Sequence, residues 1–378
     1  MTFHSAPASI GNRAMARVDP AAIAHNLDQV RRRMGSGGPA SQGPRVWASI
    51  KADAYGHGIH HVVPALADAD GLAVSRLADV AVCRDAGWRG PILIYGGLQD
   101  LIEVAHLDQP GLHLVISSVE QLDWLAARPL HCPPPWLWLR YVGDLGVIGL
   151  DYDTYRAAYA RCEPWLARGD IAGIGHFQHY AAADLPIGIA AAQARFRTLT
   201  ARMAGPRSTS SSPTILCHPE HAATTHWIRP GRLLYGLSPL PDRTGTQLGL
   251  RPALSMRARL AAVHEVAAGT PLGYHGAFVA PTAMRVGVVN CGYAQGYPGH
   301  PPVGMPVLVN GRLARGLGQV MMEHLLVDLG NHPDAAPGTP VILWGTPELP
   351  AEHVAAACGR TAPELITGLT GRVPIRAS

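Results

Sequence analysis

Short apolar runs alternate with helix-like segments through the first two-thirds of the chain, and this alternation constrains the fold most. Parallel strands need long crossovers, usually helices, so repeated strand–helix units indicate an α/β protein. Eight such runs within about 230 residues predict a (β/α)8 (TIM) barrel, with a doubly wound open sheet as the alternative. Both folds place functional loops at the carboxyl ends of the strands. The predicted strands are 46–50, 72–75, 92–95, 112–117, 136–141, 171–176, 214–217 and 233–237, and the predicted helices include 60–67, 78–86, 119–127, 152–166 and 187–203.

The pattern changes after about residue 240, where apolar runs alternate with Gly, Pro and Asn turns, which is typical of a mostly β domain. We therefore expect a flexible N-terminus over residues 1–12, an α/β barrel over 13–240 and a β domain over 241–378. Two patches rich in small residues and proline, 35–44 and 208–213, are expected to be flexible surface loops. The predicted strands of the β domain are 254–263, 283–289, 303–309, 325–329 and 340–344.

The composition excludes several classes of protein. Hydrophobic residues make up 47% of the 378 residues and charged residues 15%, which is enough apolar material for a large core. A net charge of +4 without a basic patch does not favour nucleic-acid binding. We find no apolar run of about 18 residues that would predict a membrane span. The six cysteines include no CxxC pair, and we find no signal peptide in residues 1–17. These features predict a cytoplasmic protein with reduced thiols and no zinc site.

Lys51 is the only lysine among 31 basic residues. A drift from Lys to Arg wherever only a surface charge matters explains the arginines, and Lys51 would then be a chance survivor. Alternatively, arginine is unacceptable here, because only an ε-amine can lose its proton and attack a carbonyl as a Schiff-base nucleophile. The context favours the second interpretation. Lys51 follows the apolar run 46–50 and precedes a turn-rich segment, 52–58, and barrel enzymes place their chemistry at the carboxyl ends of strands.

Residues 46–58, with the sequence VWASIKADAYGHG, resemble the pyridoxal phosphate (PLP) signature of alanine racemases. That family has an N-terminal PLP-binding barrel and a C-terminal β domain. The resemblance implies a PLP-dependent racemase that interconverts L- and D-alanine, supplies D-alanine for the cell wall and acts as a head-to-tail homodimer. The similarity covers nearly the whole chain in order, through residues 19–26, 71–97, 228–237, 251–278, 291–298, 316–328 and 364–374.

The resemblance assigns the catalytic roles to Lys51 and Tyr274. Lys51 would carry PLP as a Schiff base and act as one acid/base group. Tyr274, in the sequence LGYHG, falls where the family keeps a second base, which reaches the opposite face of the substrate from the partner subunit. Inversion of a Cα needs proton removal on one face and delivery on the other, so two bases suit this chemistry. Without the resemblance, Tyr274 would be interpreted as a half-buried strand tyrosine.

The resemblance also assigns residues that hold the cofactor and the substrate. Arg229 would hydrogen-bond the pyridine nitrogen and keep it unprotonated, which weakens the electron sink; alone it would be interpreted as a surface charge. His179 would pack against the cofactor ring, or else be an ordinary satisfied polar group. Phosphate-binding positions fall at Tyr55, His221, Gly231 and Arg232, and substrate-pocket positions at Tyr293 and Met322, of which Met322 could equally be packing.

Some family residues are replaced in this chain. The family's arginine that contacts the cofactor's phenolic oxygen and the substrate carboxylate aligns with Val147, and the often carbamylated lysine that orients it aligns with Arg140. Arginine cannot form a carbamate, so the changes look coupled, and we expect Arg140 to compensate in substrate binding. The family's phosphate-contacting serine aligns with His221 or Ala222. Milder departures are Gln295, Glu323 and Pro363.

These departures leave the substrate open. The leading hypothesis is an alanine racemase, and Val147 could instead mark a racemase of another amino acid. A PLP decarboxylase or lyase is a second class, which Arg229 disfavours because such chemistry prefers a protonated pyridine. A PLP-binding protein without turnover is the third. We expect no metal, nucleic-acid or membrane partner.

Overall fold

The computed structural model describes residues 14–35, 43–127 and 133–378, which form two compact units. One unit is Ala21–Arg243. The other joins the described N-terminal residues, up to Pro20, to Thr244–Ser378. The expected N-terminal tail, residues 1–12, lies outside the described residues, as does most of the patch 35–44.

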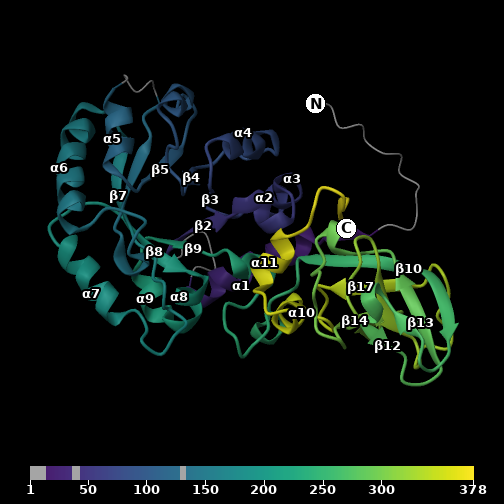
Figure 1. Ribbon diagram of the computed structural model, residues 1–378. Helices are drawn as coiled ribbons and strands as arrows, with labels where there is room; N and C mark the ends of the chain where they lie inside the picture. The colour runs from purple at the N-terminus through teal and green to yellow at the C-terminus, as the bar shows by residue number, and fades with distance from the viewer. Residues whose placement is uncertain (1–13, 36–42, 128–132) are drawn as a thin grey trace. The chain divides into compact units, whose positions relative to one another are not determined.

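The first unit is a closed barrel of eight parallel strands, which confirms the predicted fold and excludes an open sheet (Figure 1). Buried parallel strands are continuous apolar runs, and six of the eight were predicted to within two residues at either end. The strands are β2 Arg45–Ser49, β3 Gly71–Val74, β4 Ile92–Ile94, β5 Leu112–Ile116, β6 Trp136–Arg140, β7 Gly173–Phe177, β8 Arg207–Ser211 and β9 Trp227–Arg229. The α-helices and short helical turns are α1 Pro20–Arg33, α2 Lys51–Gly56, α3 Ile59–Val62, η1 Val63–Leu66, α4 Ala78–Asp85, η2 Leu101–His106, α5 Val119–Ala126, η3 Gly143–Leu145, α6 Tyr152–Arg168, α7 Ala190–Leu199, α8 Ser212–Cys217, α9 Pro219–Thr224 and η4 Arg232–Tyr235.

The last two predicted strands of the barrel were wrong. Residues 214–217 lie in helix α8, and residues 233–235 lie in the turn η4. The seventh strand is β8, in the serine-rich patch that was expected to be a surface loop. Its serines are buried, and the Ser208 hydroxyl donates to the Trp227 carbonyl at 3.1 Å. Such a hydrogen bond lets a polar side chain be buried in a strand that has no apolar pattern.

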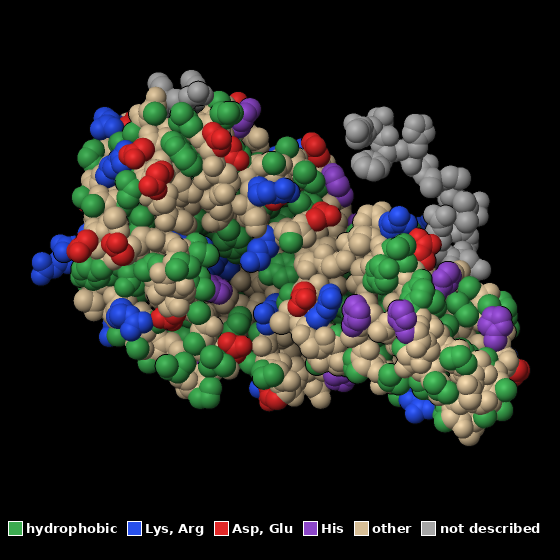
Figure 2. Space-filling model, viewed as in Figure 1, with side chains coloured by type: hydrophobic (Ala, Val, Ile, Leu, Met, Phe, Trp, Pro, Cys, Tyr) green, Lys and Arg blue, Asp and Glu red, His purple; other side chains and the backbone are tan. Residues whose placement is uncertain are grey.

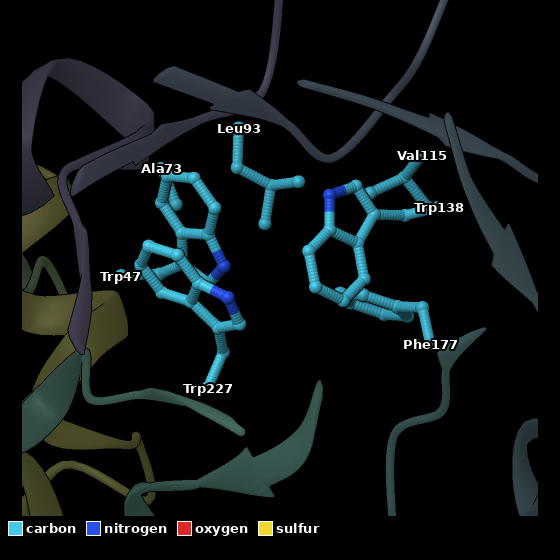
Figure 3. Packing of buried hydrophobic residues seen from close by; sticks show 7 residues of the cluster. All are labelled: Trp47, Ala73, Leu93, Val115, Trp138, Phe177 and Trp227. Atoms are coloured by element: carbon cyan, nitrogen blue, oxygen red, sulfur yellow. The ribbon is translucent and has the colours of Figure 1, made fainter. Parts of the chain in front are cut away.

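Tryptophans fill the centre of the barrel against glycines on the neighbouring strand. Trp47 pairs in register with Gly71, and Trp138 pairs with Gly175. A Cβ added at either glycine would overlap the indole ring of its partner. Trp47 also stacks on Trp227, with ring centroids 4.0 Å apart. These tryptophans belong to one buried cluster of the barrel, which consists of Trp47, Ala73, Leu93, Val115, Trp138, Phe177 and Trp227 (Figure 3).

The second unit is built on an eight-stranded sheet in the order β13-β16-β15-β14-β17-β10-β1-β18, which confirms the mostly β domain. Its first strand, β1 Met15–Val18, pairs antiparallel with β10 and parallel with β18. Residues 14–20 therefore belong to this unit, although the expected boundary placed them in the barrel. The other elements are η5 Thr246–Leu248, β10 Leu254–Val266, β11 Pro271–Leu272, η6 Tyr274–Gly276, β12 Phe278–Val279, β13 Met284–Val289, η7 Tyr293–Gln295, β14 Pro306–Val309, β15 Arg312–Leu317, β16 Leu325–Asp328, β17 Pro340–Trp344, α10 Ala351–Ala357, α11 Ala362–Thr367 and β18 Ile375–Ala377.

Three further findings concern the composition arguments. Within residues 14–35, 43–127 and 133–378, no helix has the length and apolar character needed to cross a bilayer. No cluster of metal-binding side chains occurs in that same part of the chain. The five cysteines that the structure describes are free thiols, and Cys132 lies outside the described residues.

Candidate active site

Lys51 follows strand β2 and opens a left-handed turn. Ala52, Asp53, Ala54 and Tyr55 all have φ between 50° and 54°, a conformation that costs an L-residue roughly 1–2 kcal/mol. Such strain persists only where the surroundings enforce it, and here the Asp53 carboxylate accepts a hydrogen bond from the Ile59 amide at 2.9 Å. The turn places both Lys51 and Tyr55 on the wall of one pocket.

This pocket of about 390 Å³ lies at the carboxyl ends of the barrel strands. The described residues that line it include one lysine and three arginines but no Asp or Glu, so the pocket is suited to anions. Figure 2 shows basic side chains around a hollow in the surface of the barrel unit. The lining residues are Ser49, Lys51, Tyr55, Tyr95, Arg140, Leu145, Phe177, His179, Ser211, Ser212, Pro213, Arg229, Gly231 and Arg232.

The environment of Lys51 favours its neutral amine. Burial lowers the pKa of Lys51, and the charges of Arg140, Arg229 and Arg232 lower it further, in that order. The Nζ atom lies 5.7 Å from the centre of the Tyr95 ring. A larger fraction of this amine is therefore unprotonated, and nucleophilic, near neutral pH than for an ordinary lysine.

One end of the pocket forms a cradle of hydroxyl groups and backbone. The Gly231 amide donates to the Ser212 hydroxyl at 3.0 Å. A Cβ on Gly231 would lie 2.5 Å from the Tyr55 hydroxyl, so only glycine fits there. The Ser211 hydroxyl is buried without a hydrogen-bond partner in the described part of the chain. Together with the Arg232 side chain, these groups can hold a phosphate.

Arg229 is buried, and each of its Nη groups donates to a protein acceptor. Its Nη1 donates to the Ser208 hydroxyl and its Nη2 to the Gln178 carbonyl, each at 2.8 Å. Its guanidinium carbon lies 4.0 Å from the centre of the Phe177 ring. Burial lowers the pKa of Arg229 to about 10, so the group remains charged at neutral pH. Arg229 is therefore no surface charge, and it is held rigidly at the pocket wall.

Two more rings complete the pocket. Burial, with the charges of Arg229 and Arg140, lowers the pKa of His179 to about 3, so its imidazole is neutral at pH 7. The Tyr95 hydroxyl is hydrogen-bonded to the Ser49 hydroxyl at 2.7 Å. Tyr95, Ser211 and Ser212 were missed in the sequence. Each lies at or just after the end of a strand, and that position is the only signal that could have found them.

His221 does not line this pocket, contrary to its predicted place beside a phosphate. Its Nδ1 accepts a hydrogen bond from the Gln193 amide at 2.7 Å, and its Nε2 lies 3.0 Å from the Thr209 hydroxyl. The ring is committed to these two partners. The predicted seventh strand, 214–217, lies after the observed strand β8, and the hydroxyl residues that follow β8 and line the pocket are Ser211 and Ser212.

Three predicted site residues belong to the second unit, which is described by itself. Tyr274 lies at the tip of the β11–β12 hairpin with 58% of its surface exposed. Met322 and Tyr293 are neighbours, because the Ala294 amide donates to the Met322 carbonyl at 2.9 Å and the Tyr293 amide to the Met321 carbonyl at 3.2 Å. Both side chains are exposed. These residues are available to a ligand or to another protein surface.

Two family profiles match the chain. The profile described as alanine racemase, N-terminal domain, matches residues 18–239, and that described as alanine racemase, C-terminal domain, matches residues 253–377. The chain belongs to the alanine racemase family. Curated relatives agree: the alanine racemases of Bordetella avium (strain 197N) and Bordetella petrii are each 41% identical, over 96% of this chain and 98% of their own length.

Solved structures of the family have the same fold. The biosynthetic alanine racemase of Pseudomonas aeruginosa superposes with a TM-score of 0.88 at 38% identity, covering 97% of this chain and 99% of that protein. The alanine racemase of Streptomyces lavendulae gives a TM-score of 0.87 at 28% identity, covering 98% of each chain. The Bartonella henselae alanine racemase, solved with covalently bound PLP, supports the fold alone, at 21% identity and a TM-score of 0.81. The family membership inferred from residues 46–58 is confirmed.

The pocket of this alanine racemase family member fits PLP. Lys51 offers the amine for an aldehyde, and the cradle at Gly231 offers the hydroxyl groups of Tyr55, Ser211 and Ser212 for a phosphate. The unpartnered Ser211 hydroxyl is a donor that a phosphate oxygen would satisfy. The volume of about 390 Å³ lies within the usual range for small-ligand sites.

Proposed function

We propose that this chain is a PLP-dependent alanine racemase that uses Lys51 and Tyr274 as its two bases. The observation that carries the proposal is the place of Lys51. The only lysine of the sequence lies at the end of a barrel strand, in a pocket lined by cations and lacking described carboxylates. D-alanine for the cell wall would be the product in the cell, as the family resemblance implies.

PLP would be held by Lys51 at its aldehyde and by Tyr55, Ser211, Ser212, Gly231 and Arg232 at its phosphate. When bound, PLP supplies the electron withdrawal that acidifies the substrate Cα–H bond. Arg229 would face the pyridine nitrogen with a positive charge that its two hydrogen bonds hold in place. This charge opposes protonation of that nitrogen and so favours racemisation over decarboxylation. His179 would pack against the ring as a neutral imidazole.

The proton transfers need a group on each face of the substrate Cα. The lowered pKa of Lys51 supports it as the base on one face. We propose Tyr274 for the other, contributed by a second copy of the chain in a head-to-tail homodimer. Its exposure at the tip of a hairpin supports this assignment, because such a side chain can enter another subunit's pocket. Tyr293 and Met322 would reach the same substrate pocket. The free thiols of the described cysteines support a reducing, cytoplasmic location.

Incubation of the PLP-loaded protein with L-alanine, followed by chirality-resolved chromatography, tests the proposal. We expect D-alanine to accumulate until both enantiomers are equal. An amine and CO₂ would indicate a decarboxylase, and unchanged L-alanine with PLP bound would indicate a binding protein without turnover. Tyr274→Phe should slow one direction of proton transfer more than the other.

A racemase of another amino acid is the second candidate, because Val147 replaces the family's carboxylate-binding arginine. Val147 is 85% exposed and does not line the pocket. A chirality-resolved screen of the common amino acids distinguishes the two, since a substrate other than alanine would then be turned over faster.

A further inference from the structure

We infer that Arg140 holds the carboxylate of the substrate. This assignment rests on the proposed function and identifies the binding group that the site needs once Val147 is excluded. Arg140 is the last residue of β6, and its backbone carbonyl is fixed by the Leu150 amide at 2.8 Å. The side chain therefore starts from a barrel strand rather than from the exposed loop that carries Val147.

The charge of the pocket calls for two anions. Four cationic side chains line it, and the described lining residues contain no carboxylate. A phosphate held by Tyr55, Gly231 and Arg232 would neutralise one end. Arg140 and Arg229 share a neighbour, Phe177, with their guanidinium carbons 5.6 and 4.0 Å from the ring centre.

These two arginines differ in their hydrogen bonds. Arg229 gives both Nη groups to protein acceptors. Arg140 has no ion pair in the part of the chain that the structure describes, and its buried Nε lacks any acceptor there. A buried guanidinium with an unused fork of donors is the group that binds carboxylates in a bidentate way. Among the two arginines beside Phe177, Arg140 is thus the one whose donors no described protein group takes up.

Arg140 also acts on the group that the substrate must approach. After burial, its charge is the largest cause of the lowered pKa of Lys51. The other polar neighbours cannot replace it, because His179 is neutral and the pKa of Tyr95 is raised by burial, so the phenol stays protonated. Because Arg140 and Lys51 line one pocket, a carboxylate bound at Arg140 would share that pocket with the reactive amine.

The alternative ligand of the Arg140 guanidinium is the phenolic oxygen of PLP. The following experiment distinguishes that oxygen from the substrate carboxylate. Acetate, a carboxylate without an amine, is titrated into the PLP-loaded protein by calorimetry, with neutral acetamide as the matched ligand. The variants are Arg140→Met and Arg140→Lys. Arg168→Met is the control variant, because Arg168 is an exposed residue at the end of α6 that pairs with Asp170 at 2.7 Å.

We expect Arg140→Met to weaken acetate binding by roughly 10- to 100-fold, as for the loss of a charge-assisted hydrogen bond. The alanine KM should rise similarly with a smaller change in kcat, and the absorbance band of bound PLP should remain. Arg140→Lys should recover part of the acetate affinity, whereas acetamide binding and Arg168→Met should match the wild type.

Unchanged acetate affinity in Arg140→Met would overturn the inference. A loss of PLP affinity without a loss of acetate affinity would overturn it too, and would place the phenolic oxygen at Arg140. Failure of the wild-type protein to bind PLP is a separate result, which would refute the proposed function.

Discussion

Replacement of Ala52 by glycine should stabilise this protein or leave it unchanged, although Ala→Gly substitutions usually destabilise. Ala52 is an exposed residue of the left-handed turn after Lys51, with φ 53°. Glycine adopts the left-handed conformation without the steric cost that alanine has, which adds about 1–2 kcal/mol to the free energy of unfolding. The greater freedom of glycine in the unfolded chain lowers that free energy by about 0.5–1 kcal/mol. The net change is therefore a gain of about 0–1.5 kcal/mol.

Ala157→Gly is the matched control. Ala157 is exposed within helix α6, where glycine should destabilise by about 1 kcal/mol. The two variants have the same composition and should differ by about 1–2.5 kcal/mol, which for a unit of this size corresponds to roughly 2–10 °C in Tm. Urea unfolding of the barrel unit, followed by tryptophan fluorescence, measures the difference. Equal destabilisation by both variants would refute the left-handed turn at Lys51.

Three other perturbations test the pocket and the barrel core. Ser211→Ala should weaken PLP affinity about tenfold and leave binding of unphosphorylated pyridoxal unchanged. Ser210→Ala is the control, because the Ser210 hydroxyl is buried but does not line the pocket. Equal effects of Ser211→Ala on PLP and pyridoxal would contradict the phosphate cradle. Gly71→Ala should lower the free energy of unfolding by about 1–3 kcal/mol, since the new methyl group would overlap Trp47. Adding Trp47→Leu to the Gly71→Ala protein should relieve part of that loss. Strictly additive effects of the two substitutions would contradict this packing. Burial lowers the pKa of Lys51, and its positive neighbours lower it further. Formation of the PLP adduct should therefore reach half its maximal rate at a lower pH than with a free lysine side chain, and Arg140→Met should shift that midpoint upward. A midpoint unmoved by Arg140→Met would contradict this electrostatic account.

The sequence predicted most of the barrel because its buried parallel strands are continuous apolar runs. Strands β2 to β7 were found in this way. The prediction failed at β8, a buried serine-rich strand in which Ser208 donates to the Trp227 carbonyl and accepts from Arg229, and at β9, which has only three residues. The N-terminal strand β1 was assigned to the wrong unit because its partner β10 lies more than 230 residues away, at a separation that local patterns do not encode.

The candidate site was predictable where a motif carried it. Lys51, Tyr55 and His179 were expected from the family resemblance, as were Arg229, Gly231 and Arg232, and all six line one pocket. His221 was wrong because the alignment depended on a strand that does not exist. The left-handed turn was not predictable either, since it is formed by four non-glycine residues whose conformation the surrounding fold imposes.

The central claim is that the Lys51 amine binds the aldehyde of PLP. The most direct measurement is borohydride reduction of the PLP-treated protein, followed by proteolysis and mass spectrometry. We expect a single pyridoxyl group on the peptide that contains Lys51, and none in Lys51→Ala. A protein that remains colourless and unmodified with excess PLP, or one modified only at its N-terminal amine, would contradict the account.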